Sequence, residues 1–110
     1  MPPSPGSVHL RPRLDSGAAE LWQWARQRRG AWTCQDASAA CGISASRCRA
    51  IVLAMHRAGY IDQVEASELS NNGRTPATWR LSPAGRALRG APVMITDALN
   101  GTIVGFRPAQ

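Results

Sequence analysis

The sequence contains no lysine, a single phenylalanine and a single tyrosine, and few acidic residues. Its 13 basic residues are therefore all arginine, and with 7 acidic residues they give a formal net charge of +6. Arginine binds phosphate or guanine through two parallel hydrogen bonds, so this surplus favours a polyanionic partner. A GC-rich genome would also favour arginine over lysine, but it does not explain the excess of positive charge.

Long apolar stretches are also missing. No run reaches the roughly 18 apolar residues that a membrane span needs, and the N-terminal stretch MPPSPGSVHLRPR lacks the apolar centre of a signal peptide. We therefore expect a cytoplasmic, reducing location and no membrane partner. The three cysteines, Cys34, Cys41 and Cys48, form no CxxC pair of the kind that structural zinc sites use, so small buried thiols are the simpler interpretation.

The residue patterns of common catalytic sites are absent as well. The acidic residues are scattered, Cys48 has no histidine on its own helical face, and no glycine loop is suited to cradle phosphate. His56 has no second histidine or carboxylate at ligand spacing and is expected to be an exposed helix residue. We therefore expect neither an enzyme nor a site for a metal or cofactor.

The length of 110 residues fits one domain with tails. Residues 1–13 hold four prolines with serine and glycine, a composition that predicts a disordered arm. Residues 14–89 are predicted to form the folded domain. Residues 90–110 form a C-terminal extension with two apolar runs around Asn100-Gly101, for which a β-hairpin is favoured over a short helix in TDALNG.

Three helices are predicted at the start of the folded domain. The first begins at Asp15 or Ser16 and runs through GAAELWQWARQRR until Gly30. Its apolar residues share one face and should be buried, with Trp24 beside them. These residues are Leu14, Ala18, Leu21 and Ala25.

The second and third helices follow closely. Thr33 and Asp36 are spaced as a capping box before a short helix over about 34–41. Ser44 then caps a third helix, of roughly four turns, which ends at Gly59. The stripe of this third helix that should face the core comprises Cys48, Val52, Met55 and Gly59, with Ile51 at its edge. The opposite side near its N-terminus carries Ser46, Arg47, Arg49 and Ala50.

The exposed side of the third helix combines small residues with arginines. Small side chains allow close approach to a DNA major groove, while guanidinium groups bind guanine O6 and N7 or phosphate. An ordinary solvated helix face is the alternative, and we favour DNA contact because Arg74 lies on a nearby predicted loop.

After the third helix, residues 60–66 and 77–81 are predicted strands joined by the loop SELSNNGRTP, with Arg74 at its tip. Residues 82–89 predict a short helix with Pro83 at its first position. The apolar positions of the two strands are Val64, Trp79 and Leu81. Three of the four tryptophans are expected in the core, and Trp22 is the candidate for a subunit contact.

This order of elements resembles the winged helix-turn-helix plan, most closely over TCQDASAACGISASRCRAIVLAMHRAGYI, residues 33–61. LSPAGR, residues 81–86, resembles the Leu-Thr-x-x-Gly-Arg pattern that follows the wing in MarR-like and PadR-like bacterial transcriptional regulators, with Ser82 replacing threonine. Together the resemblance spans residues 16–89. It implies an α+β fold, a three-helix core with a β-hairpin wing, double-stranded DNA as partner and a homodimer. The predicted DNA-binding residues are Ser44, Ser46, Arg47, Arg49, Ala50, Arg74 and Arg80.

Some positions depart from the family pattern. Ala37 and Cys41 stand where leucines are usual, and Ala45 stands where a DNA-reading polar side chain is common. Leu53, at a usually polar position, and the apolar C-terminal extension favour a protein contact. A winged-helix module that binds protein, as an adaptor, assembly factor or inhibitor, is therefore the alternative function. We expect the extension to pair across a two-fold axis in a dimer, and folding back on its own domain is the alternative.

Overall fold

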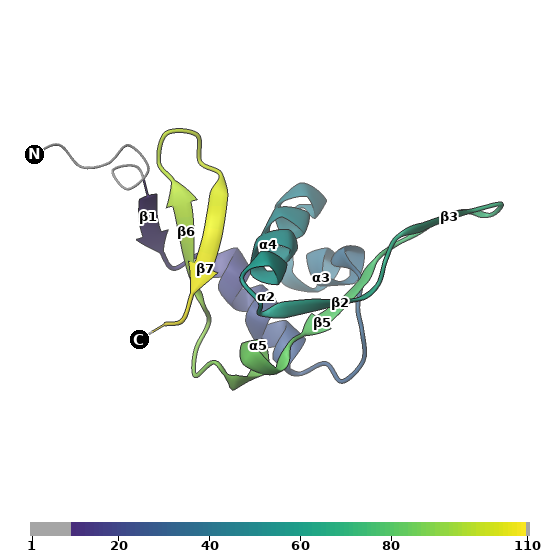
Figure 1. The fold of residues 1–110 in the computed structure, drawn as a ribbon, viewed down its shortest axis with the longest axis horizontal. Helices are drawn as coiled ribbons and strands as arrows, with labels where there is room; N and C mark the ends of the chain where they lie inside the picture. Colours follow the sequence, from purple (N-terminus) through teal and green to yellow (C-terminus); the bar gives the residue numbers. More distant parts are fainter. Residues whose placement is uncertain (1–9, 110) are drawn as a thin grey trace, which may run out of the picture.

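The computed structural model describes residues 10–109 and shows a mixed α+β chain with antiparallel strands, as the sequence predicts. After one short strand come the main helices, and the remaining strands form two hairpins with a short helix between them (Figure 1). The elements are β1 (Leu10–Arg13), α2 (Ser16–Arg26), α3 (Cys34–Cys41), α4 (Ala45–Arg57), β2 (Ile61–Glu65), β3 (Glu68–Ser70), β4 (Gly73–Thr75), β5 (Thr78–Leu81), α5 (Pro83–Ala87), β6 (Val93–Asp97) and β7 (Ile103–Arg107).

The predicted helix starts are confirmed, because each is capped by a local side chain. Asp15 accepts a hydrogen bond from the amide of Ala18 at the start of α2. Thr33 and Asp36 form the reciprocal capping box of α3. Ser44 caps α4 by accepting from the backbone amide of the third helical residue.

Helix α2 ends at Arg26 and does not continue to Gly30, so the predicted C-terminal boundary is wrong. The chain leaves the helix because Trp32 pairs with Trp79 through two backbone hydrogen bonds of 2.9 and 2.8 Å. The carbonyls freed at the helix end find a side-chain partner, since Arg86 donates to the carbonyls of Arg26 and Arg28. These contacts span more than 40 residues of sequence and left no local signal.

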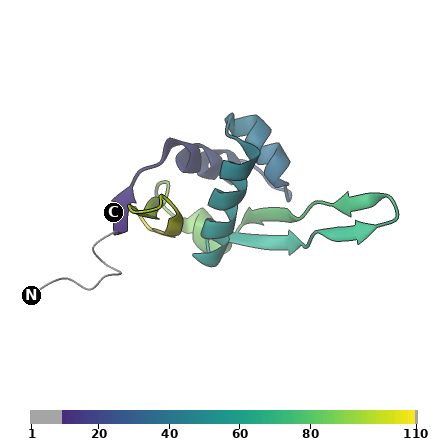
Figure 2. The same ribbon diagram turned by 90° about the horizontal axis from the view of Figure 1, so that it is seen from above.

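Residues 61–81 form one extended hairpin, which we call the long hairpin. The predicted loop over residues 67–76 is wrong in detail, because β3 and β4 pair within it around the turn at Asn71-Asn72, next to Gly73 with φ of 107°. Val64, one of the apolar positions of the predicted strands, is exposed, and a register shift between Gln63 and Glu65 leaves it outside the pairing with β5. The long hairpin projects away from the helices (Figure 2).

The second hairpin, β6 and β7, confirms the predicted hairpin around Asn100-Gly101, and we call it the C-terminal hairpin. It forms a three-stranded antiparallel sheet with β1 in the order β1-β6-β7. The prediction of a disordered arm is therefore wrong for residues 10–13, while residues 1–9 lie outside the described residues. Pro12 is compatible with this strand because β1 lies at the edge of the sheet.

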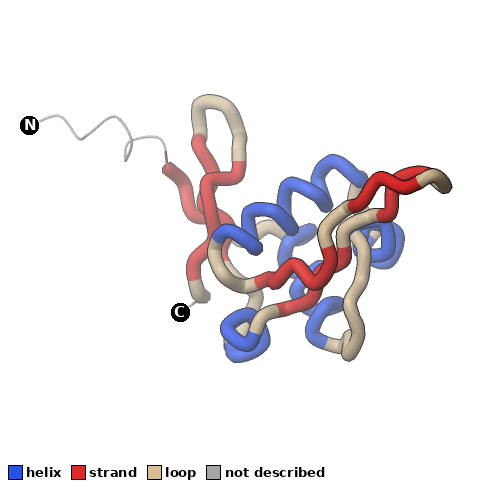
Figure 3. Tube along the Cα trace, turned by 45° about the vertical axis from the view of Figure 1, so that its right-hand side comes forward, coloured by secondary structure: helices blue, strands red, loops and turns tan. Residues whose placement is uncertain are grey.

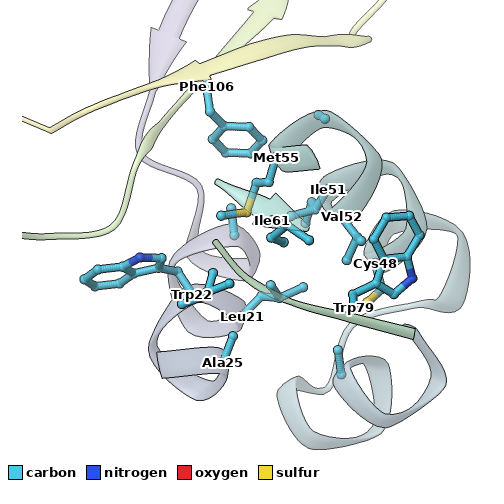
Figure 4. Close-up of a cluster of buried hydrophobic side chains, with 14 of the residues drawn as sticks. Leu21, Trp22, Ala25, Cys48, Ile51, Val52, Met55, Ile61, Trp79 and Phe106 are labelled. Carbon is cyan, nitrogen blue, oxygen red and sulfur yellow. The ribbon is translucent and has the colours of Figure 1, made fainter. Parts of the chain in front are cut away.

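One hydrophobic core joins the helices to both hairpins (Figure 4). The predicted stripe of α4 is buried at Cys48, Ile51, Val52 and Met55, but Gly59 is exposed because it lies beyond the end of the helix. Met94 and Phe106 of the C-terminal hairpin are 1% and 9% exposed. The extension therefore packs on its own domain, which is the fold-back alternative. The core residues are Ala18, Leu21, Trp22, Ala25, Trp32, Ala37, Cys48, Ile51, Val52, Ala54, Met55, Ile61, Trp79, Leu81, Met94 and Phe106.

The core contains three of the four tryptophans, as expected, but the assignment along α2 differs. Trp22 is fully buried and its indole Nε1 donates to the carbonyl of Gly85 at 3.0 Å, so it is not available for a subunit contact. Trp24 is half-buried, and Leu14 lies before the helix with 73% of its surface exposed. Gly85 is required at this junction, because a Cβ there would collide with the carbonyl of Tyr60.

Candidate nucleic-acid interface

The outer face of α4 is the centre of the candidate site. Its apolar stripe is held against α3, β2 and β7, which leaves the opposite side of the helix in solvent. The small and basic residues predicted to lie there are indeed exposed, and they are Ser44, Ser46, Arg47, Arg49 and Ala50. The side chains of Ser46 and Ala50 are short enough to allow a partner to approach the helix backbone closely.

Arg47 has a partner that sequence reasoning missed. Its guanidinium forms an ion pair with Asp15, the capping residue of α2, whose carboxylate is almost fully buried. The same carboxylate oxygen accepts from Arg13 at 3.2 Å, while the other oxygen caps α2 by accepting from Ala18 at 3.0 Å. Because Asp15 and Arg47 are 32 residues apart, no local pattern indicated this pair. Arg47 therefore links the start of α2 to the first turns of α4.

Arg49 and Arg74 approach the same cavity from two elements. This cavity has a volume of about 390 Å³ and lies between α4 and the long hairpin. Leu53 and Trp79 contribute apolar wall to it, and Arg74 is steadied by donating to the Ser67 hydroxyl at 3.3 Å. The structure thus unites two of the predicted DNA-binding arginines, one from a helix and one from a hairpin, at a single concave surface.

A second cavity of about 480 Å³ lies on the other side of α4, against the C-terminal hairpin. It is lined by Ser44, Ser46, Arg47, Ala50, Leu53 and Arg57 from the helix region and by Gly101, Thr102 and Ile103 from the hairpin. The outer face of α4 therefore lies between two hairpins, the long one on its right and the C-terminal one on its left in Figure 1. Sequence reasoning treated only the long hairpin as a neighbour of this helix.

Arg80 is not part of this arrangement. Neighbouring residues on a strand point to opposite faces, so Arg80 points away from the side on which Trp79 lines the cavity beside α4. Arg80 instead lines a separate cavity together with Arg29 and Arg86. Of the seven predicted residues, the structure gathers six at the two cavities beside α4 and places Arg80 at a third cavity.

Two thiols lie where α3 packs on α4. The Cys48 thiol donates to the carbonyl of Cys34 at 3.3 Å, and Cys34 lines the cavity that contains Arg49. A hydrogen bond from Cys48 lowers the pKa of the Cys34 thiol to about 7, with a smaller lowering effect from Arg49 and an opposing effect of burial. The same contact and burial raise the pKa of Cys48. Cys34 is therefore the thiol with the greater anionic character at neutral pH.

His56 is exposed on α4, as predicted, but its ring contacts two other residues. Its ring Nδ1 lies 2.8 Å from the carbonyl of Ile61, and the ring meets Trp79 edge-on at 5.4 Å between centroids. Within residues 10–109, no group of three or more His, Cys, Asp or Glu side chains is arranged to hold a metal ion. In the same range, no helix has the length and apolar character to cross a membrane.

Comparison with protein-family models, with curated proteins and with solved structures finds no match to this chain.

Proposed function

We propose that the chain is a winged helix-turn-helix protein that binds double-stranded DNA. In this proposal α3 and α4 form the helix-turn-helix, α4 enters the major groove, and the long hairpin is the wing. The observation that carries the proposal is the convergence of Arg49 on α4 and Arg74 on the long hairpin at one concave, exposed surface. A helix with short side chains and guanidinium groups on its outer face has the shape and donors that a major groove accepts.

The two arginines have different roles in this proposal. Arg49 lies on the second turn of α4, where a guanidinium can bind guanine O6 and N7 and so contribute sequence preference. Arg74 lies near the turn of the long hairpin and is proposed to bind backbone phosphate or to enter an adjacent minor groove. Ser44, Ser46 and Ala50 are proposed to line the contact surface.

Arg47 is proposed to act chiefly by holding α4 in place. Its guanidinium faces the buried carboxylate of Asp15, yet 44% of its side chain is exposed. Guanidinium has five N–H donors, so a phosphate can share it with Asp15. This would couple the position of the first helix to contact with the DNA backbone.

The biological role that fits this chemistry is a bacterial or mobile-element transcriptional regulator in the cytoplasm. A homodimer would place two copies of α4 on successive major grooves of a palindromic site. Since the C-terminal hairpin packs on its own domain through Met94 and Phe106, we propose that the dimer uses other residues of the three-stranded sheet and its loop. This region leaves Leu10, Leu99 and Val104 exposed.

A protein-binding module is the second candidate function, and one observation favours it. Leu69 on the long hairpin is 76% exposed, and Leu53 is only half-buried on the outer face of α4. Leu53, which lines the cavity beside the long hairpin, and Leu69, which pairs with Arg74 across the strands, could each receive an apolar side chain of a partner protein. Such a contact would depend weakly on salt, whereas phosphate binding releases counterions and depends strongly on it.

Titration of duplex DNA across a range of salt concentrations separates the two candidates. A chain that neutralises about three phosphates should give a log-log slope near −3, and a dimer that neutralises about six should give a slope near −5. Arg49→Ala should lower affinity for the best sequence by about 1–3 kcal/mol and flatten the preference among sequences. The matched control is Arg89→Ala, which removes an exposed arginine from outside the site. Absence of duplex binding even at low salt would exclude DNA and leave the protein-binding module.

A further inference from the structure

A second concentration of arginine lies away from α4. Arg29, Arg80 and Arg86 surround an open cavity of about 460 Å³, and Leu81 and Pro83 complete its wall. Among residues 10–109, no carboxylate lines this cavity, so three positive charges face the same volume without an acidic residue among them. The three arginines come from separate segments: the chain after α2, strand β5 and helix α5.

The fold holds this cavity in a defined shape. Arg86 donates one hydrogen bond to the carbonyl of Arg26 at 3.3 Å and another to the carbonyl of Arg28 at 2.9 Å, which ties α5 to the end of α2. The buried indole of Trp22 makes a second tie by donating to Gly85. Because Arg86 uses only part of its donor capacity in these bonds, further N–H groups remain for a ligand.

Two further arginines belong to the segment whose carbonyls Arg86 contacts. The guanidinium of Arg26 lies 4.6 Å from the centre of the Trp22 ring, and that of Arg28 lies 4.9 Å from the Trp24 ring. Between residues 10 and 109, both ion pairs in the structure belong to Asp15, so none neutralises an arginine of this cavity. Asp62 lies opposite Arg80 in the strand register without forming an ion pair with it.

The cavity and the outer face of α4 lie on opposite sides of the molecule. Figures 1 and 3 both place α4 and α5 on opposite sides of strands β2 and β5. The buried stripe of α4 faces the core, so its exposed residues point away from α5. No residue lines both this cavity and either cavity beside α4. A rigid duplex bound along α4 would therefore leave the arginine cavity free.

We propose that the cavity formed by Arg29, Arg80 and Arg86 is a second phosphate-binding site, which takes the backbone of a second DNA duplex. Guanidinium groups bind phosphate oxygens through paired, charge-assisted hydrogen bonds. One chain then bridges two duplexes, one along α4 and one at the cavity. The inference rests on the proposed function for the first duplex and assigns Arg80 to the second.

The test measures both duplexes on the full chain. Binding of one labelled duplex is followed by fluorescence anisotropy, and bridging is followed by energy transfer between donor-labelled and acceptor-labelled duplexes. Arg29→Gln combined with Arg80→Gln removes two charges from the cavity and keeps Arg86, which has a structural role. Arg89→Gln combined with Arg107→Gln is the matched control, since it removes the same charge from exposed positions outside the cavity.

The cavity variant is expected to lower bridging by about tenfold or more while single-duplex affinity stays within about twofold, and the control should leave bridging nearly unchanged. Arg49→Gln combined with Arg74→Gln should instead abolish binding of the first duplex, which tests the proposed function separately. Absence of bridging by the native chain would overturn the second site. Equal losses of bridging in the cavity variant and the control would do the same, because they would reflect net charge alone.

Discussion

The two hairpins of this chain are both antiparallel strand pairs, but they contribute very differently to the hydrophobic core. The long hairpin reaches the core only at its base, through Ile61, Trp79 and Leu81, while Leu69 near its turn is 76% exposed. The C-terminal hairpin buries Met94 and Phe106 against α4 and gains a third strand from β1. The difference shows that a hairpin becomes part of the body when its alternate side chains reach a core, and remains an appendage when they do not.

The largest expected effect comes from removing the C-terminal hairpin. Truncation after Arg89 deletes Met94 and Phe106 together, and such residues each contribute about 2–5 kcal/mol when buried. Since a whole domain is stable by only about 5–15 kcal/mol, the truncated chain should lose cooperative unfolding in circular dichroism.

Shortening the long hairpin is the matched experiment. Glu65 and Thr78 are paired in the sheet, so an Asn-Gly turn can replace residues 66–77 between them. The change should lower the free energy of unfolding by about 1 kcal/mol or less, because the removed residues contribute little to the core. If the chain truncated after Arg89 stays folded and the chain with the shortened long hairpin unfolds, the long hairpin is the one that supports the core.

Single substitutions sharpen the same contrast. Phe106→Ala should lower the free energy of unfolding by about 3–5 kcal/mol, because a large buried ring leaves a cavity. Leu69→Ala should change it by less than about 0.5 kcal/mol, because that side chain is already in water. Urea titration of both variants measures the two values, and similar losses would show that the long hairpin has a buried contact.

For DNA binding we expect the opposite ranking: the long hairpin should contribute more than the C-terminal hairpin. Arg74→Ala on the long hairpin should weaken binding to all duplexes similarly and reduce the magnitude of the salt slope by about 1. Arg107→Ala at the end of the C-terminal hairpin removes the same charge and should leave the slope unchanged. Anisotropy titrations at several salt concentrations compare the two variants. If Arg107→Ala has the larger effect, the C-terminal hairpin is the DNA-contacting one.

The smallest effect concerns the thiol in the cavity beside the long hairpin. The thiolate is the form that reacts with iodoacetamide, so the rate of Cys34 alkylation should rise with pH. The midpoint of this rise should lie near the Cys34 pKa of about 7. Cys48→Ala removes the largest cause of this lowered pKa and should move the midpoint upward, toward the ordinary thiol value of about 8.5.

Residue-resolved mass spectrometry measures the alkylation of each cysteine separately. Cys41→Ala is the control and should leave the Cys34 profile in place, since Cys41 is not among the causes of the Cys34 shift. A Cys34 midpoint that is the same in Cys48→Ala as in the native chain would contradict the assignment of the shift to Cys48.

The sequence by itself determined the features that depend on near neighbours. The helix starts at Asp15, Thr33 and Ser44 were predictable because a capping side chain bonds to an amide only three residues away. The buried stripe of α4 followed from helical periodicity, and the exposed arginines followed from the same spacing. The turn at Asn100-Gly101 was predictable because Gly101 adopts a positive φ of 72°, which glycine favours.

Only the tertiary structure decided which distant groups meet. The pairing of Leu10–Arg13 with β6, the ion pair between Arg47 and Asp15, and the burial of Trp22 under α5 join segments that local sequence patterns do not connect. The location of Arg80 also depended on packing. Strand alternation places Arg80 and Trp79 on opposite faces of β5, and the face that meets the core was known only once Trp79 was seen to be buried. Local hydrogen bonds and periodicity specify the elements, whereas charge pairing and burial between elements depend on how those elements pack together.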